Sequence, residues 1–395
     1  MKLNKDISYL LKFLSLTHEG NITFCNDDIT SKLWKSVLAL SIKHHVNYLF
    51  YKNIKTYNLS HLVPEDILAK LHELYFQNTA KNIIFFEQLK KVLTLLQEND
   101  LSFIILKGAY LLENVYEDVG ARDISDVDFL FKHDEYEKAV KILIDKGYLG
   151  PKSPLEIDPH LYLERDVSID DEEIWHNARM VQVAGFDVLA LSNEHLILHL
   201  CLHTAYHHLF QYIGLRTLCD IKEITEKNSS EIDWNKVAKT AQVWGADKSV
   251  FVCLSLVKEL LSVKSIELKY FDYLKDKNEI SLLKEWAFNQ IFYEEDDIDN
   301  ISLFFLKLLT KRPFKEKLIC LKRLLFPPKD EIIHKYIDSD KSQKINIYFS
   351  RLNKEILRYI KFTYKYMTDP QIKLKFRKLL KLYETKERFL NHNKL

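Results

Sequence analysis

The chain has 395 residues, of which 47% are hydrophobic, and its formal net charge is +1 at pH 7. This length predicts two or three domains with substantial cores, and the balanced charge provides no overall field of the kind that marks nucleic-acid-binding or membrane-surface proteins. With only 8 glycines and 8 prolines the chain is poor in turn residues, which argues against a loop-rich β fold and favours long helices.

The cysteine pattern and the N-terminal residues indicate a cytoplasmic protein. The five cysteines are scattered and form no Cys-x-x-Cys pair, so we expect reduced thiols. The N-terminal stretch MKLNKDISYLLKFLSL has a short apolar run, but Asp6 and Lys12 interrupt it and no small-residue cleavage site follows, which argues against a signal peptide. No segment reaches the roughly 18 uninterrupted apolar residues that a membrane span needs.

The first 98 residues carry apolar side chains at three- and four-residue spacing, which predicts a series of amphipathic helices. Pro64 stands at the start of one of them, where the missing N–H group is tolerated. We expect residues 1–79 to form an N-terminal helical region and the amphipathic segment from residue 80 to open the next domain.

Residues 80–190 change to short apolar runs that alternate with amphipathic segments, a pattern typical of a small α/β core. The resulting fold class is α+β, with a small mixed sheet embedded in a mostly helical protein. In the third run Pro159 favours an edge strand or a bulge. The predicted strands are 102–106, 126–131, 155–163 and a pair within 180–190 around Gly185, and the predicted helices between them are 109–116 and 133–148.

Two acidic residues stand two positions apart where the second strand begins. Residues at this spacing on a strand project to the same side, so Asp126 and Asp128 share a face. Neighbouring carboxylates repel each other unless a cation lies between them. A hard divalent cation satisfies this need, so we expect Mg²⁺, with Mn²⁺ as the alternative, bound together with substrate phosphates.

Three further residues near this pair suit phosphate chemistry. Lys107 and Gly108 follow a buried strand and open a helix, so the glycine allows close approach of a phosphate and the lysine adds a charge. Arg122 lies four residues before Asp126 and either neutralises a triphosphate, orients Asp126 or forms a surface ion pair.

A third carboxylate is predicted from the segment LEIDPHL. A neighbouring strand can bring Asp158 to the acidic pair, with Glu156, on the same side of that strand, as its rival. Three acids from two strands can hold metal ions that bind the attacking and leaving oxygens of a phosphoryl transfer.

These motifs, in this order, resemble the polymerase-β-type nucleotidyltransferase superfamily, and most closely an uncharacterised bacterial nucleotidyltransferase family. That family reads roughly LKG…L…Y…R…SDIDLLV, then D-x-H, then hL-x-H. The matching segments here are ILKGAYLLENVY, RDISDVDFLF, DPH at 158–160 and LHLCLH at 198–203. The segments GLRTLCDI at 214–221 and RLLFPPKDEII at 323–333 extend the resemblance over most of the chain from residue 80 onward.

The resemblance implies metal-dependent transfer of a nucleoside monophosphate from an NTP to an acceptor. Gly108 would match the glycine of the nucleotide-binding turn, and Asp126 and Asp128 would match the metal-binding pair. Asp158 would match the third carboxylate, which acts as general base for the acceptor hydroxyl. The chain departs from the superfamily at Ala109, where serine is common, and so loses one hydroxyl contact to phosphate.

From residue 191 to residue 395 we expect a helical C-terminal domain that contains a ladder of histidines. Two histidines at i and i+4 can bind Zn²⁺, but no His-Glu-x-x-His pattern is present. The alternative is that the ladder packs beside the active cleft, with His203 and His160 as candidate substrate contacts. Arg216 and Asp220 predict an ion pair within one helix, whereas the resemblance implies that they help to dock this helix against the catalytic sheet. The ladder consists of His195, His199, His203, His207 and His208.

The last residues, 350–395, interleave basic and aromatic side chains. A basic amphipathic helix here could contact an acidic partner, RNA or anionic lipid, or it could be a solvated helix face with buried aromatics.

The sequence as a whole predicts an enzyme that combines an NTP with an unidentified acceptor, which is a small molecule, a peptide or RNA. One alternative keeps the fold and modifies tRNA or protein, as toxin-like members of the superfamily do. Another is a non-catalytic nucleotide-binding scaffold, although clustered acids without a metal ion are costly to bury.

Overall fold

The computed structural model describes residues 3–17, 30–150, 153–164, 167, 169–211, 213–274 and 276–292. These residues are mostly helical and contain one mixed sheet of five strands, so the predicted α+β class is confirmed. One compact unit contains Met1–Leu143 and Pro154–Glu294, whereas Ile144–Ser153 belongs to a second unit. The predicted site residues all lie in the first unit. The basic segment 350–395 and the RLLFPPKDEII motif lie outside the described residues.

Three short helices form the N-terminal part, as the apolar spacing predicts. They are α1 (Lys5–Leu14), α2 (Ser31–Lys43) and α3 (Asn47–Thr56), followed by a 3₁₀ turn at Ser60–Leu62. An aromatic cluster holds them together, because the ring of Phe13 lies 4.9 Å from that of Phe50 and 6.0 Å from that of Trp34. Aromatic rings at these separations bury large apolar areas and stabilise the packing of neighbouring helices.

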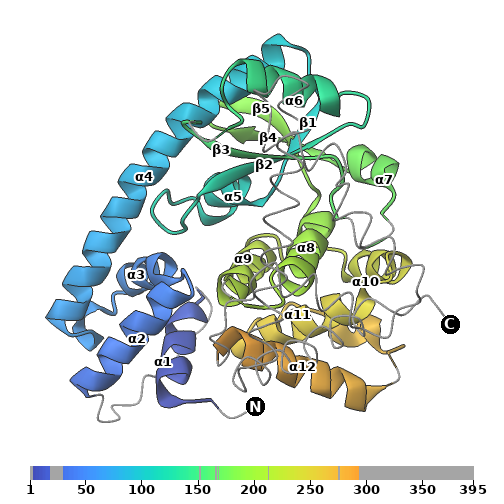
Figure 1. The fold of residues 1–395 in the computed structure, drawn as a ribbon. Helices are drawn as coiled ribbons and strands as arrows, with labels where there is room; N and C mark the ends of the chain where they lie inside the picture. The colour runs from blue at the N-terminus through green and yellow to red at the C-terminus, as the bar shows by residue number, and fades with distance from the viewer. Residues whose placement is uncertain are drawn as a thin grey trace, which may run out of the picture. The chain divides into compact units, whose positions relative to one another are not determined.

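Helix α4 (Glu65–Glu98) connects the N-terminal helices to the sheet (Figure 1). Pro64 is its N-cap, next to the position predicted for a proline. At its C-terminal end it buries Leu89, Val92, Leu93 and Leu96. With 34 residues the helix is about 50 Å long, so one rigid element spans both parts of the unit.

The five strands have the order β3-β2-β1-β5-β4. β2 pairs in parallel with β3 and antiparallel with β1, whereas β1 pairs in parallel with β5, and β4 and β5 form a hairpin. β3 is an edge strand, which is where the sequence places Pro159, because proline has no N–H group to donate to a second neighbour. The strands are β1 (Phe103–Ile105), β2 (Asp126–Phe131), β3 (Glu156–His160), β4 (Arg179–Val183) and β5 (Phe186–Ala190).

The pairing of β2 with β3 sets the register of the acidic residues. Asp126 lies opposite Glu156, and Asp128 lies opposite Asp158. The other face of β2 is apolar, and its Phe129 ring lies 5.2 Å from that of Phe103 in an edge-to-face contact. This aromatic core determines which face of β2 is buried, and so turns the acidic residues to the opposite face.

Helical segments connect the strands. α5 (Lys107–Leu111) follows β1 and continues as a π-helix at Leu112–Tyr116, and α6 (Tyr136–Asp145) lies between β2 and β3. α7 (Asp171–His176) lies between β3 and β4. α5 with its π-helical continuation and α6 occupy the two regions where the sequence predicts helices, and α7 is an additional helix.

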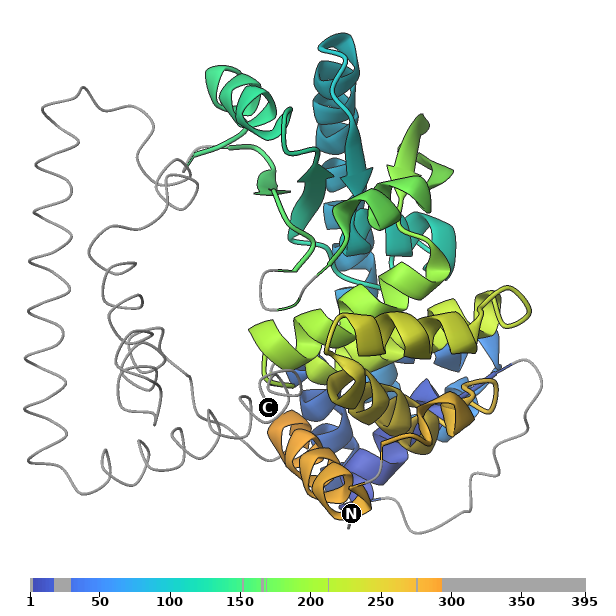
Figure 2. The same ribbon diagram turned by 90° about the vertical axis from the view of Figure 1, so that its right-hand side faces the viewer.

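The C-terminal helices lie below the sheet in the views of Figure 1 and Figure 2. The sequence predicts continuous helix here, but Leu209 and Phe210 have φ of 49° and 63°, which breaks the helix after a π-helical turn at His203–His207. None of the described helices is both long and apolar enough to cross a membrane. The helices are α8 (Asn193–Leu202), α9 (Gly214–Lys227), α10 (Trp234–Val243), α11 (Asp247–Leu260), a 3₁₀ turn at Leu268–Phe271 and α12 (Lys277–Phe292).

Candidate metal and nucleotide site

A cavity of about 380 Å³ lies between the acidic face of the sheet and the helices α8 and α9. Its volume is in the range of small-molecule binding sites. The structure brings all the residues predicted for the catalytic, metal, nucleotide and substrate positions into its lining: Asp126, Asp128, Asp158, Lys107, Gly108, Arg122, His160 and His203.

Two carboxylates and an imidazole meet in this cavity. The Nε2 atom of His160 lies 3.1 Å from Oδ1 of Asp128 and 3.3 Å from Oδ2 of Asp158. One donor atom from each residue lies within 4.8 Å of the others, and no other group of three such side chains is this close within the described ranges. The predicted approach of Asp158 to Asp128 is therefore present, and the group could hold a divalent metal ion.

Cations neutralise the two carboxylates. Burial tends to raise the pKa of Asp128, but the charge of Lys107, 3.2 Å away, and the hydrogen bond from His160 outweigh it and hold the pKa below its usual range. Burial tends to lower the pKa of His160, but its bonds to Asp128 and Asp158 raise it to about 9. At neutral pH the two ionised carboxylates are thus neutralised by Lys107 and by the protonated ring of His160. A divalent cation at this group would take over that neutralising role and would displace the proton of His160.

Asp126 lies in the same lining, outside the close group. Its Oδ1 accepts a hydrogen bond of 3.1 Å from the hydroxyl group of Ser125. Glu156, its partner in the register, is exposed and does not line the cavity. Of the two candidate carboxylates on β3, Asp158 rather than Glu156 is thus the one that reaches the acidic pair.

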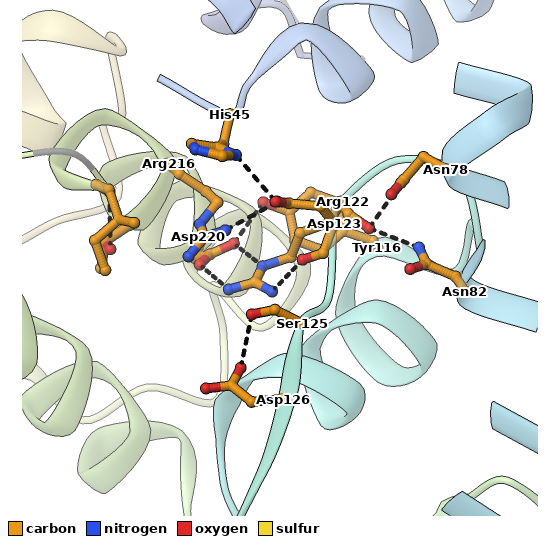
Figure 3. A network of polar contacts seen from close by, with 12 residues as sticks. His45, Asn78, Asn82, Tyr116, Arg122, Asp123, Ser125, Asp126, Arg216 and Asp220 are labelled. Carbon is orange, nitrogen blue, oxygen red and sulfur yellow. Dashed lines mark hydrogen bonds and ion pairs between the residues drawn. The ribbon is translucent and has the colours of Figure 1, made fainter. Parts of the chain in front are cut away.

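Arg122 is bound to a buried acid, as Figure 3 shows. Its Nε and Nη2 atoms donate to the two carboxylate oxygens of Asp220 at 2.8 and 2.9 Å, and the hydroxyl group of Tyr116 donates to the same carboxylate at 2.7 Å. Arg122 is 6% exposed and Asp220 1% exposed. Of the roles predicted for Arg122, the structure shows an ion pair, in the interior rather than at the surface.

The ion pair predicted between Arg216 and Asp220 is wrong, because each residue pairs outside its own helix. Arg216 donates through Nη1 to Asp123 at 2.9 Å, and His45 also lies 3.0 Å from that carboxylate. Both residues of α9 thus dock the helix against the segment that leads into β2 (Figure 3). These partners could not be inferred from the sequence, because each lies more than 90 residues away along the chain.

Two asparagines of α4 hold the same segment from the other side (Figure 3). The side chain of Asn78 donates to the carbonyl groups of Gly120 and Arg122, and that of Asn82 donates to those of Val119 and Arg122. A buried polar residue repeated at i and i+4 on an apolar helix face is a signal that the sequence analysis overlooked. The start of β2 is therefore fixed by α4 and α9 together.

The histidine ladder divides between the cavity and the core. His203 lies 3.3 Å from Nζ of Lys107 and 3.0 Å from His208, whereas His195 stacks on Trp244. Burial lowers the pKa of His199 to about 3, with a further contribution from Lys107, so this ring is neutral. Among the described residues the ladder forms no group with the geometry of a zinc site.

Comparison with known proteins places these residues in a family. A family described as "Uncharacterised nucleotidyltransferase" matches residues 30–262, which is more than half of the 395 residues. The chain belongs to this nucleotidyltransferase family. The match contains the sheet, the cavity and both helices that border it, and it confirms the resemblance of the sequence motifs to a nucleotidyltransferase family. No curated protein and no solved structure matches the chain.

Proposed function

We propose that this nucleotidyltransferase moves a nucleoside monophosphate from an NTP to an acceptor hydroxyl group with the help of a divalent metal ion, Mg²⁺ or Mn²⁺. The acceptor oxygen forms a bond to the α-phosphorus, the bond from that phosphorus to the β-bridging oxygen breaks, and pyrophosphate leaves. The observation that carries the proposal is the Asp128–Asp158–His160 group inside the cavity of a chain from this family.

The charges of the cavity suit a metal-bound triphosphate. The lining includes the acidic residues of β2 and β3 on one side and the cationic side chains of Lys107 and Arg216 on the other. The imidazoles of His203 and His208 lie there too, and burial lowers the pKa of each, so these rings are neutral. A triphosphate with its metal ion carries both signs, so it matches both walls. Lys107 already bridges the walls, because its Nζ lies 3.2 Å from Asp128 and 3.3 Å from His203.

Gly108 supports a close approach by the ligand. A Cβ atom built at this position would lie 3.5 Å from Ile124 and 3.6 Å from the carbonyl oxygen of Asp126, which are ordinary contacts. The protein itself therefore has room for a larger residue at this place in the cavity lining. A glycine here is consistent with a phosphate that needs the space.

The carboxylates differ in exposure and so in proposed role. The side chain of Asp128 is 2% exposed, whereas that of Asp158 is 57% exposed. We assign Asp126 and Asp128 to metal binding, and Asp158 to metal binding and to accepting the proton of the acceptor hydroxyl. A bound divalent ion would polarise the phosphate and acidify that hydroxyl. The ion pair with Asp220 makes Arg122 a residue that positions β2, so we assign phosphate binding to Lys107 and Gly108.

Substitution of the buried carboxylate tests the proposal. We expect Asp128→Asn to reduce pyrophosphate release and nucleotide transfer on the order of 10³-fold, because one of the charges that hold the metal ion is lost. Asp158→Asn changes a more exposed side chain and should give a similar loss without affecting the fold. The matched control is Glu156→Gln on the same strand, outside the cavity, which should retain activity.

The assay uses the four labelled NTPs in a cell extract, followed by identification of the labelled product, since the acceptor is not defined. Label in a small molecule, a peptide, a protein or RNA names the acceptor class. An Asp128→Asn protein that is folded and as active as the wild type would overturn the assignment. A wild-type protein that binds no nucleotide in the presence of Mg²⁺ or Mn²⁺ would overturn nucleotidyl transfer itself.

A further inference from the structure

The described lining of the cavity contains one side chain with a six-membered ring, that of Tyr162. The other described lining residues are charged, polar, imidazole-bearing or aliphatic. Tyr162 is 41% exposed, which leaves much of its ring open to a ligand. Flat aromatic faces of this kind are the surfaces on which proteins stack nucleobases.

The ring of Tyr162 is held in place in spite of its exposure. Its centroid lies 4.8 Å from that of His133, with an angle of 76° between the two planes. The Nε2 atom of His133 in turn lies 2.9 Å from Oδ2 of Asp171, in an exposed contact. A ring that is already oriented loses little freedom when a ligand stacks on it, so binding is less costly than for a mobile side chain.

The position of Tyr162 along the chain relates it to the metal group. It follows His160 by two residues, a distance of at most about 7 Å between the Cα atoms. A nucleotide whose phosphates lie at Asp158 and His160 therefore extends its ribose and base within reach of this ring. β3 and the residues directly after it thus carry two members of the proposed metal-binding group and then the aromatic ring, in the order in which a nucleotide carries phosphate and base.

We propose that Tyr162 is the platform on which the base of the bound nucleoside triphosphate stacks. The inference rests on the proposed function, because it needs the phosphates at the metal group. Stacking uses the π-face that every base has, so the subsite accepts all four bases and binds purines more tightly than pyrimidines.

The test compares a ligand that has a base with one that does not. Binding of α,β-methylene-ATP and of inorganic tripolyphosphate, each with Mg²⁺, is measured by calorimetry on the full chain. We expect Tyr162→Leu to weaken binding of the ATP analogue at least about fivefold, and Tyr162→Phe to change it less than about twofold. Tripolyphosphate should bind all variants equally.

A tyrosine of similar exposure provides the matched control. Tyr270 is 36% exposed and lies outside the cavity, so Tyr270→Leu should leave both affinities unchanged. Equal affinity of wild type and Tyr162→Leu for the ATP analogue would overturn the stacking role and leave the proposed function intact. Failure of wild type to bind either ligand would overturn the proposed function itself. Loss of tripolyphosphate binding in Tyr162→Leu would show a general disturbance of the site and so also contradict the inference.

Discussion

His44 is a buried imidazole at the end of α2, 2% exposed and 5.6 Å from the ring of Phe292. Its Nε2 has no hydrogen-bond partner among the residues that the structure describes. Burial, with smaller contributions from Lys43 and His45, lowers its pKa from 6.5 to about 4. The folded protein therefore keeps this ring neutral at a pH where the unfolded chain binds a proton.

This difference predicts how stability depends on pH. Between pH 6.5 and 4 the unfolded state binds one more proton at His44 than the folded state, so stability falls as the pH falls. The loss from this residue reaches roughly 3 kcal/mol at pH 4. His44→Phe should flatten the pH dependence over this range in urea unfolding experiments. An unchanged slope would contradict the assignment.

The candidate site shows which residues a sequence can predict. Asp126, Asp128 and Asp158 were predicted because strands alternate their faces and two strand patterns were clear from apolar runs. His160 was predicted as a substrate contact, and its place between two carboxylates could not be foreseen, because it depends on the register of two strands. The role of Arg122 could not be chosen from the sequence either, because its partner Asp220 belongs to a helix and lies 98 residues away along the chain.

At the scale of elements, α9 is docked by two ion pairs of different burial. Arg122 and Asp220 are almost fully buried, whereas the side chains of Arg216 and Asp123 are 18% and 15% exposed. Removal of one partner of a buried ion pair costs much stability, because the other charge stays buried without a partner. The intact pair contributes less to the free energy of unfolding than this cost suggests. The inner pair should therefore dominate the response to mutation.

Asp220→Ala leaves the guanidinium of Arg122 buried without its carboxylate. We expect the free energy of unfolding to fall by about 3–5 kcal/mol. The double variant Arg122→Met, Asp220→Leu removes both charges and should recover most of that loss. Chemical denaturation of the three proteins checks this, and a double variant no more stable than Asp220→Ala would contradict the explanation.

The elements themselves were predicted unevenly. The apolar runs and the hairpin glycine, Gly185 with φ of 81°, were sufficient to predict all five strands. The π-helical turns at Leu112–Tyr116 and His203–His207 were missed, because one extra residue in a turn leaves no mark in the spacing of apolar side chains. Such turns occur often at functional sites, and the second one places His203 beside Lys107.

At the scale of the whole molecule, the cavity couples ligand binding to stability. A ligand that binds only the folded state stabilises it by about 2.7 kcal/mol at a concentration of 100 Kd. For a unit of this size such a gain corresponds to a rise in Tm of roughly 5 °C. Metal binding should thus be visible without knowledge of the acceptor.

We therefore expect Mn²⁺ or Mg²⁺ to raise Tm and EDTA to reverse the effect. The Asp–Asp–His donor set includes an imidazole, a ligand better suited to Mn²⁺ than to Mg²⁺, so the larger shift should come from Mn²⁺. Differential scanning fluorimetry with Asp158→Asn as control measures this. A shift of the same size in Asp158→Asn would place the ion elsewhere on the molecule.

An edge strand pairs with a single neighbour. β3, which contains both Asp158 and His160, pairs with β2 alone. If this strand separates from β2, two of the three residues of the candidate metal group leave with it, although the rest of the sheet can stay intact. The candidate metal group thus depends on the pairing of β3 with β2. Substitutions that weaken the pairing of β3 with β2, even far from the site itself, would consequently look like active-site defects in an activity assay.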